Sequence, residues 1–309
     1  MKRKSFFIFI LLFISAAIVF SELQLTHNTA NNKINVVTTL FPLYDFARTI
    51  GGDKVNVTLL LPPGVEPHSF EPKPSDVIKI NQSDIFIYTG SAMEPWAADI
   101  IKNIPSTTLV LDSSNGVNKL AEGLAVGQTA TQAIDPHIWL DYDNDKIIAQ
   151  AITKLLISKE PDYAVYFQGN ANTYQAAISD LDQSYQTKLT SCQSREVVYA
   201  GHYAMGYLTH RYNLKYTAAQ GISPDAEPTV QDLAKLVNQI NNNHIKYIFY
   251  EELSSPKIAE TLSAETGAKL LLLNAGHNIS KDDLESGATF ISIMQKNLDN
   301  LIIGLGCNL

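Results

Sequence analysis

The hydrophobic pattern of this chain alternates between two kinds of segment. Short runs rich in Val, Ile, Thr and Tyr are typical of buried strands, and longer segments with apolar residues at helical spacing are typical of amphipathic helices. The predicted strands cover residues 34–40, 55–61, 85–88, 108–111, 196–200, 214–218, 247–250 and 269–273. The predicted helices cover residues 42–50, 75–82, 95–102, 143–158, 161–190, 202–212, 229–241, 256–266 and 281–301. This alternation of strand and helix predicts parallel, doubly wound sheets.

One helical pattern is much longer than the others and separates two strand–helix series. It begins at Pro161, continues to Thr190 and contains no strand signal. Roughly 30 residues at about 1.5 Å each span about 45 Å, enough to run the length of a two-lobed molecule. We therefore predict an α/β fold of two Rossmann-like lobes with parallel sheets, joined by one long rigid helix. Two ordinary helices within one domain are the alternative interpretation.

The N-terminus has the pattern of a secretory signal. Three basic residues at 2–4 precede an apolar run from Phe6 to Phe20, and polar sequence begins at Ser21. Roughly 15 apolar residues are fewer than the about 20 that a membrane-spanning helix needs, so we predict cleavage after Ser21, with an uncleaved anchor as the alternative. No cysteine lies near this position, so lipid attachment there is not expected. The predicted division is a signal peptide at 1–21, a flexible lead-in at 22–33, an N-terminal lobe at 34–160, the linking helix at 161–190 and a C-terminal lobe at 191–309.

Composition and charge narrow the class of partner. The chain has 309 residues, of which 45% are hydrophobic and 17% charged, with a formal net charge of −8. This composition is that of a globular protein with enough length for two ordinary domains. An acidic chain with few basic patches argues against nucleic acid as a partner and is compatible with a cation as ligand.

The chain contains two cysteines, Cys192 and Cys307. An even number of cysteines in an exported protein suggests a disulfide, which here would join the start of the second series to the end of the chain. Two buried free thiols are the alternative, and cysteines this far apart are a poor zinc-finger pattern.

Four of the seven histidines follow predicted strands. Ligands in open α/β sheets bind beyond the carboxyl ends of the strands, and this rule selects His68, His137, His202 and His277. His137 lies in the stretch from Asp135 to Asp141, between a proline and an apolar run that can anchor the segment in a core. Each histidine alone is more often a hydrogen-bonded loop residue than a ligand. The set of four, two from each series, predicts a metal site in a cleft between the lobes.

The donor type indicates which metal the site would hold. Four neutral imidazoles supply four nitrogens at about 2.0–2.1 Å, which suits tetrahedral Zn²⁺, whereas calcium and magnesium prefer oxygen ligands. Four protein ligands close the coordination sphere, and the sequence has none of the common hydrolase, phosphate-loop or dinucleotide motifs, so we expect no enzyme. Each ligating ring should pass its other N–H to an acceptor, and the candidate acceptors are Asp141, Glu66, Glu251 and Glu252.

Several motifs resemble the substrate-binding proteins of zinc and manganese ABC transporters. They are Pro62–His68, Asp135–Asp141, Gly201–Tyr207 and Ser223–Pro228, and the resemblance covers residues 34–308. It implies two lobes joined by a long rigid helix, with the metal at the lobe interface. It also implies that His68, His137 and His202 match metal ligands, and that histidine at the third of these positions is typical of zinc carriers.

The chain departs from the family pattern at two places. The loop 115–133 contains no histidine, whereas many zinc carriers have a histidine-rich and acidic loop there. The usual fourth ligand is an aspartate just after the last strand, but this chain has Asn274, a weak donor for a transition metal. Some relatives place a glutamate three residues later, which corresponds to His277. We predict His277 as the fourth ligand, with Glu251 or a water molecule as alternatives.

The sequence therefore predicts an exported protein, periplasmic or associated with the cell surface, that binds Zn²⁺ and delivers it to the permease of an ABC transporter for high-affinity uptake. We expect it to act as a monomer. The alternatives are a manganese carrier of the same family, a secreted zinc metallohydrolase and a cell-surface adhesin.

Overall fold

The computed structural model describes residues 33–123, 125–127, 133–222, 227–252 and 255–308. The predicted signal peptide and nearly all of the lead-in therefore lie outside the described residues. The chain divides into a unit from Met1 to Lys33 and a unit from Ile34 to Leu309. The architecture below is that of the second unit.

Two four-stranded parallel sheets organise this unit. The first has the order β2-β1-β3-β4 and the second the order β6-β5-β7-β8, so in both sheets the strand that comes first in the chain lies in an interior position. The strands are β1 Ile34–Thr38, β2 Val55–Leu59, β3 Ile85–Tyr88, β4 Leu109–Asp112, β5 Glu196–Tyr199, β6 Lys215–Ala218, β7 Tyr247–Tyr250 and β8 Lys269–Leu272. Every predicted strand is confirmed, with ends that differ by two residues or fewer. Parallel pairing throughout confirms the predicted α/β class with two lobes.

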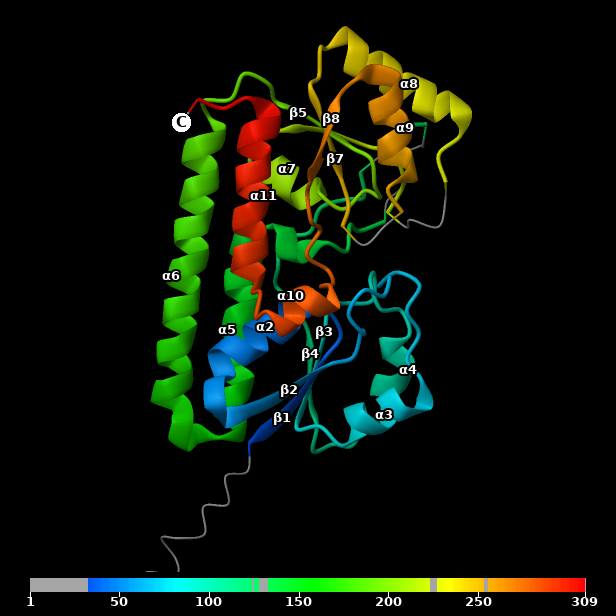
Figure 1. Cartoon of the computed structure of the whole chain (residues 1–309). Helices are drawn as coiled ribbons and strands as arrows, with labels where there is room; N and C mark the ends of the chain where they lie inside the picture. The colour runs from blue at the N-terminus through cyan, green and yellow to red at the C-terminus, as the bar shows by residue number, and fades with distance from the viewer. Residues whose placement is uncertain (1–32, 124, 128–132, 223–226, 253–254, 309) are drawn as a thin grey trace, which may run out of the picture. The chain divides into compact units, whose positions relative to one another are not determined.

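The helices follow the strands as the alternation predicts. They are α2 Phe41–Gly51, α3 Pro74–Asn81, α4 Ala97–Ile101, α5 Tyr142–Lys159, α6 Ala164–Leu189, α7 Gly206–Arg211, α8 Val230–Asn242, α9 Lys257–Thr266, α10 Lys281–Glu285 and α11 Phe290–Leu305. Figure 1 shows α3 and α4 on the opposite face of the first sheet from α2 and α5, and α8 and α9 on the opposite face of the second sheet from α11.

Two helix predictions are wrong in their bounds. The helix predicted from His202 begins at Gly206, because the backbone around His202 bonds to other loops: Tyr203 N–H donates to Gly221 O. The closing helix predicted over 281–301 is two helices, α10 and α11. Gly287 between them has a φ of +81°, and the hydroxyl of Thr289 accepts the N–H of Ser292 to begin α11.

The long helix is confirmed and lies in a layer of helices that both lobes share. It consists of a 3₁₀ turn, Pro161–Tyr163, followed by the 26 residues of α6, a length of about 39 Å for the α-helical part. α6 packs against α5, α2 and α11, and Figure 1 shows it running beside α11 past the levels of both sheets.

One hydrophobic core cluster runs through this helical layer into both sheets, and two smaller clusters lie outside it. It includes Phe46 from α2, Tyr185 from α6 and Phe290 from α11. The rings of Phe46 and Phe290 are 5.3 Å apart at an interplanar angle of 78°, and the Tyr185 hydroxyl donates to Met294 O at 2.6 Å. Because the two lobes share this core, the boundaries 34–160, 161–190 and 191–309 stay a proposal rather than an observed division.

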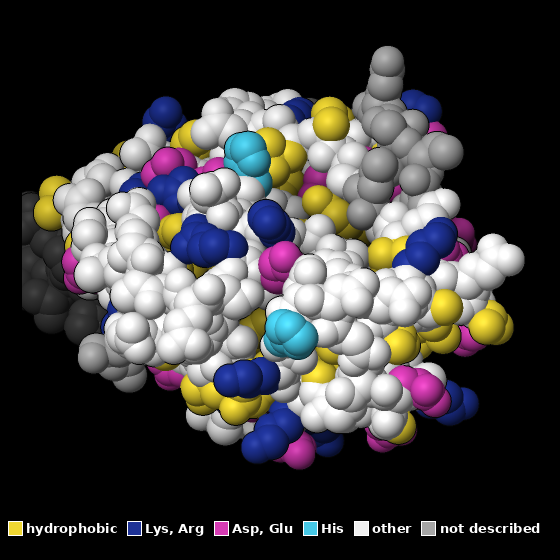
Figure 2. Space-filling model, turned by 90° about the horizontal axis from the view of Figure 1, so that it is seen from above, with side chains coloured by type: hydrophobic (Ala, Val, Ile, Leu, Met, Phe, Trp, Pro, Cys, Tyr) yellow, Lys and Arg dark blue, Asp and Glu magenta, His cyan; other side chains and the backbone are white. Residues whose placement is uncertain are grey.

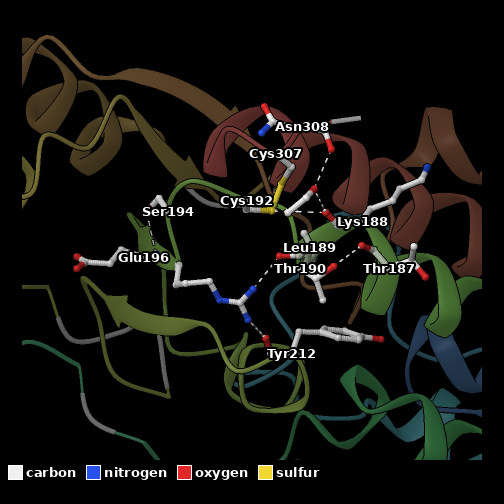
Figure 3. Close-up of a disulfide and its surroundings, with 12 residues drawn as sticks. Thr187, Lys188, Leu189, Thr190, Cys192, Ser194, Glu196, Tyr212, Cys307 and Asn308 are labelled. Carbon is white, nitrogen blue, oxygen red and sulfur yellow. Dashed lines mark hydrogen bonds between the residues drawn. A yellow bond between two sulfur atoms is a disulfide. The ribbon is translucent and has the colours of Figure 1, made fainter.

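A disulfide joins Cys192 to Cys307, across 115 positions of sequence, as predicted. It connects the residues just after α6 to those just after α11, and Figure 3 shows the two side chains meeting there. Backbone bonds support the same contact, since Ser194 N–H donates to Leu305 O at 3.0 Å. In the chain-entropy model a loop of this length contributes about 4–5 kcal/mol, an upper figure because the model is disputed.

The surface carries charges of both signs. Figure 2 shows Lys and Arg side chains interspersed with Asp and Glu on the face seen from above, with hydrophobic side chains in small groups. No helix in the described part of the chain is both long enough and apolar enough to cross a membrane.

The shared core generates a prediction about motion. Separating or rotating the lobes would break packing between α2, α6 and α11, which is costly because protein interiors are close-packed. We therefore expect metal loading to rotate the lobes by an angle on the order of a few degrees, well below hinge-type closure. Crystal structures or solution scattering of the metal-free and metal-loaded forms measure this, and a rotation of tens of degrees would contradict it.

Candidate metal centre

The four predicted histidines converge at the carboxyl ends of the two sheets. His68 follows β2, His137 follows β4 in sequence, His202 follows β5 and His277 follows β8. Potential ligand atoms of His68, His137 and His202 lie within 4.8 Å of one another. A second group with the same limit contains His202, Glu251 and His277. His202 belongs to both groups, so the four imidazoles and one carboxylate form a single cluster, in which His68 is half-buried and the other members are buried.

His137 is fixed in place by two neighbours in its own segment, Trp139 and Asp135. The Nε1 of Trp139 donates to Ala275 O at 2.8 Å, which anchors the apolar run in the core between the lobes. The carboxylate of Asp135 accepts the backbone N–H of His137 at 3.0 Å and the ring Nδ1 at 2.7 Å. With Nδ1 engaged in this way, Nε2 is the nitrogen that faces the cluster. Sequence analysis missed Asp135 as the acceptor, although its position two residues before His137 is the spacing of a side chain that bonds its own turn.

The ring of His202, in the other lobe, is likewise oriented by a carboxylate at its Nδ1. Its Nδ1 is 2.9 Å from Glu251 Oε2, and both side chains are buried. Its Nε2 therefore points toward His137, and the two Nε2 atoms are 3.2 Å apart. Two nitrogens bound to one tetrahedral zinc at about 2.0–2.1 Å lie about 3.3 Å apart. The observed separation is thus already that of two ligands of one ion.

His68 and His277 complete the cluster from loops. The backbone N–H of His68 donates to Glu66 Oε1 at 3.0 Å, which shapes the loop that carries the ring. Among the described residues, Nε2 of His68 and Nδ1 of His277 are buried and have no hydrogen-bond partner. Buried polar nitrogens without a partner are costly, and a metal ion would satisfy them.

The loop after β8 decides where His277 lies. Gly276 has a φ of +69°, and a Cβ there would lie 2.8 Å from Met294 Cε, so glycine permits this turn. The ring is 3.7 Å from Glu251, measured from Nε2 to Oε1. Asn274 bonds other residues around this loop. Its Oδ1 accepts the N–H of Gly276 at 2.7 Å and its amide donates to Glu252, so it builds the turn that presents His277.

Asp141, the remaining predicted acceptor, caps a helix instead. Asp141 accepts the N–H of Asp143 at 2.9 Å and begins α5, and it bonds no histidine ring in the described structure. Of the four acceptors predicted from sequence, Glu251 is confirmed as the partner of a ring nitrogen, that of His202.

The pKa of His202 is shifted in the opposite direction from the pKa values of the other three histidines. Burial lowers the pKa of His277 to about 3, and burial together with neighbouring imidazoles lowers the pKa of His68 and His137 well below the usual value. Burial also acts on His202, but the charge of Glu251 and its hydrogen bond outweigh it and raise the pKa of His202. In the metal-free protein a proton on His202 Nε2 can therefore bond His137 Nε2, at the place where a metal ion would bind both.

A family model and a curated relative that match this chain both describe zinc-uptake proteins. A model of the family described as "Zinc-uptake complex component A periplasmic" matches residues 36–303. The "High-affinity zinc uptake system protein ZnuA" of Bacillus subtilis (strain 168) is 35% identical over 283 residues, which cover 89% of this chain and 88% of the relative.

Longer relatives match over part of their length. The "Zinc-binding protein AdcA" of Streptococcus pyogenes serotype M18 is 32% identical over 321 residues, 97% of this chain but 61% of that protein. The crystal structure of the Zn(II)-bound ZnuA-like domain of Streptococcus pneumoniae AdcA is similar with a TM-score of 0.77 and 33% identity, covering 89% of this chain and 99% of that one.

The raised pKa of His202 generates a prediction about pH. A proton on His202 must leave before its Nε2 can bind a metal, so zinc affinity is highest above this pKa and is lost as pH falls through it, by about tenfold per pH unit for one displaced proton. In Glu251→Gln the carboxylate charge that raises the pKa is removed, so the loss should begin at a lower pH. Chelator competition from pH 8 to pH 5, as round values on either side of the ordinary histidine pKa of about 6.5, measures both curves. Identical pH midpoints in the two proteins would contradict this account.

Proposed function

This chain belongs to the family of zinc-uptake complex component A proteins, and we propose that it captures Zn²⁺ outside the cytoplasm and delivers it to the permease of an ABC transporter. The family is one of metal-binding transport proteins, not of enzymes. The metal is cargo in this function, so the site must both bind the ion tightly and give it up.

The observation that carries the proposal is the 3.2 Å separation of the His137 and His202 Nε2 atoms, with each opposite ring nitrogen at a carboxylate. An acceptor on Nδ1 fixes the tautomer and makes Nε2 a better donor to a metal. His68 and His277 supply the third and fourth nitrogens, and their unpartnered buried atoms support a place in the ligand set.

Zinc is favoured over manganese by the donor types. Manganese prefers carboxylate and carbonyl oxygens, whereas imidazole suits zinc. The carboxylates of Asp135 and Glu251 face Nδ1 atoms, where they support the rings. A ligand set of four protein nitrogens also leaves no position for an activated water, which a metallohydrolase requires.

The distribution of ligands between lobes supports release as well as capture. His68 and His137 come from the first lobe, and His202 and His277 from the second. A small displacement of one lobe would therefore break two bonds to the ion at once. The core cluster described above resists such a displacement, so we propose that contact with the permease supplies the energy for release.

Metal analysis of the purified protein tests the function. We expect about one Zn²⁺ per chain after exposure to equal zinc and manganese, as the tetrahedral nitrogen site favours zinc, with no hydrolytic turnover. Deleting the gene should abolish growth under zinc limitation and leave adherence unchanged. Preferential manganese binding, or loss of adherence with normal zinc-limited growth, would reject the proposal in favour of the manganese carrier or the adhesin.

The fourth ligand generates a separate prediction. His277→Ala should keep the fold but weaken zinc binding by at least about tenfold, or about 1.4 kcal/mol, because it removes one nitrogen donor. Glu251→Gln should weaken binding less, since an amide oxygen still accepts from His202 Nδ1, and Asn274→Ala less again. Competition with a chelator at a single high pH, about 8 or above, gives the affinities, because protons compete least with the metal there.

Two results would change this ligand set. An unchanged affinity in His277→Ala would remove His277 from it. A collapse in Glu251→Gln at high pH would identify Glu251 as the fourth ligand instead.

A further inference from the structure

Helix α7 connects the two halves of the metal centre. It begins at Gly206, four residues after His202, and it packs on the segment 135–141 that carries His137. We propose that Tyr207 and Arg211 of α7 form a positioning clamp that fixes His137 relative to His202 and thereby sets zinc affinity and coordination geometry. The clamp deepens the proposed function and rests on it, since it acts on two of the proposed ligands.

Tyr207 holds the N-terminal end of the segment. Its hydroxyl donates to Asp135 O at 3.1 Å and accepts the N–H of Leu120 at 3.0 Å, and the side chain is buried. Asp135 is also the residue whose carboxylate bonds the ring of His137. The Tyr207 hydroxyl therefore fixes the backbone of the residue that orients the ligand.

Arg211 holds the C-terminal end of the same segment. Its Nη1 is 2.8 Å from Asp141 Oδ1 and 2.9 Å from Asp143 Oδ2. Its Nε and Nη2 bind the carboxylate of Asp182, on α6, at 2.9 Å and 2.6 Å. One guanidinium thus joins α7 to the beginning of α5 and to the long helix through charge-assisted bonds, of which the pair to Asp182 is bidentate.

The spacing of these contacts makes them a two-point attachment. Tyr207 and Arg211 are four residues apart, so they lie on one face of α7. Their partners Asp135 and Asp141 bracket His137 on either side. A segment held at both ends cannot rotate about a single bond. Gly206 allows the close approach, since a Cβ there would lie 2.5 Å from Asp135 Oδ2.

The clamp controls how closely the positions of the ligand rings match the geometry that binds a metal. A metal site works when its ligands are held within about 0.5 Å of the productive geometry. Losing the clamp would leave all four imidazoles present, but ordering them would then cost binding free energy. Affinity should fall, and the ligand field of a bound metal should change, without loss of any ligand.

The test is Tyr207→Phe with Tyr185→Phe as its matched control. Tyr185 is also a buried tyrosine that donates to a backbone carbonyl, that of Met294, but this bond joins α6 to α11 rather than α7 to the segment 135–141. Both variants keep the ring and lose the hydroxyl. Zinc affinity is measured by chelator competition, unfolding of the metal-free protein by denaturant, and ligand geometry by the visible spectrum of the Co²⁺-substituted protein.

We expect Tyr207→Phe to weaken zinc binding about fivefold or more relative to Tyr185→Phe, the factor that corresponds to about 1 kcal/mol, the typical net value of one hydrogen bond. The Co²⁺ spectrum should shift in Tyr207→Phe and not in Tyr185→Phe. If the two variants weaken binding to the same extent, or if the spectra match that of the wild type, the clamp is rejected.

Arg211→Lys keeps the proposal testable if Tyr207→Phe does not fold. Lysine keeps the charge but lacks the planar fork, so zinc affinity should lie between those of wild type and Arg211→Met. Equal zinc affinity in wild type, Arg211→Lys and Arg211→Met would reject the clamp. Zinc affinity equal to that of the wild type in every variant would reject the clamp alone, whereas failure of the wild type to bind zinc would reject the proposed function.

Discussion

The structure depends on holding two imidazole nitrogens, one from each lobe, 3.2 Å apart in a buried site. Two bare ring nitrogens at this separation repel one another, so the arrangement requires a cation or a proton between them. Asp135 and Glu251 orient the rings from opposite lobes and make this geometry definite. The site is therefore built around a positive charge, and the metal-free protein meets that requirement through the raised pKa of His202.

Keeping that distance constant requires lobes that do not move freely. The helical layer of α2, α5, α6 and α11 supplies this constraint, because its core continues from the first sheet to the second. Polar contacts near the site add to it. The side-chain amide of Asn278, in the loop after β8, donates to Pro62 O at 2.9 Å and to Val65 O at 2.6 Å, in the loop that carries His68. The ligand loops of different lobes are thus bonded to each other as well as to their own sheets.

A transport protein must release its ion, and a rigid site that binds the ion tightly makes release slow. The proposed set of four nitrogen donors favours slow release, and release is part of the proposed task. The competition between proton and metal at His202 gives one way for the empty site to stay stable. The division of ligands between lobes gives a way for a partner to open the site with a small movement. Tight binding then depends on the ligand rings and their acceptors, and release depends on a movement between the lobes.

The sequence alone determined the strand–helix alternation, the long helix, the cysteine pair and the four histidines that converge. Hydrophobic periodicity is a local property, and the rule that ligands bind beyond the carboxyl ends of parallel strands converts it into a site. The tertiary structure alone decided that Asp135 and Glu251 orient the rings and that Asn274 builds a turn. It also decided that the closing helix breaks at Gly287, where a positive φ is needed. The contact of Glu251 with His202 joins residues 49 positions apart, and the break at Gly287 rests on a backbone angle; neither leaves a periodic signal in the sequence.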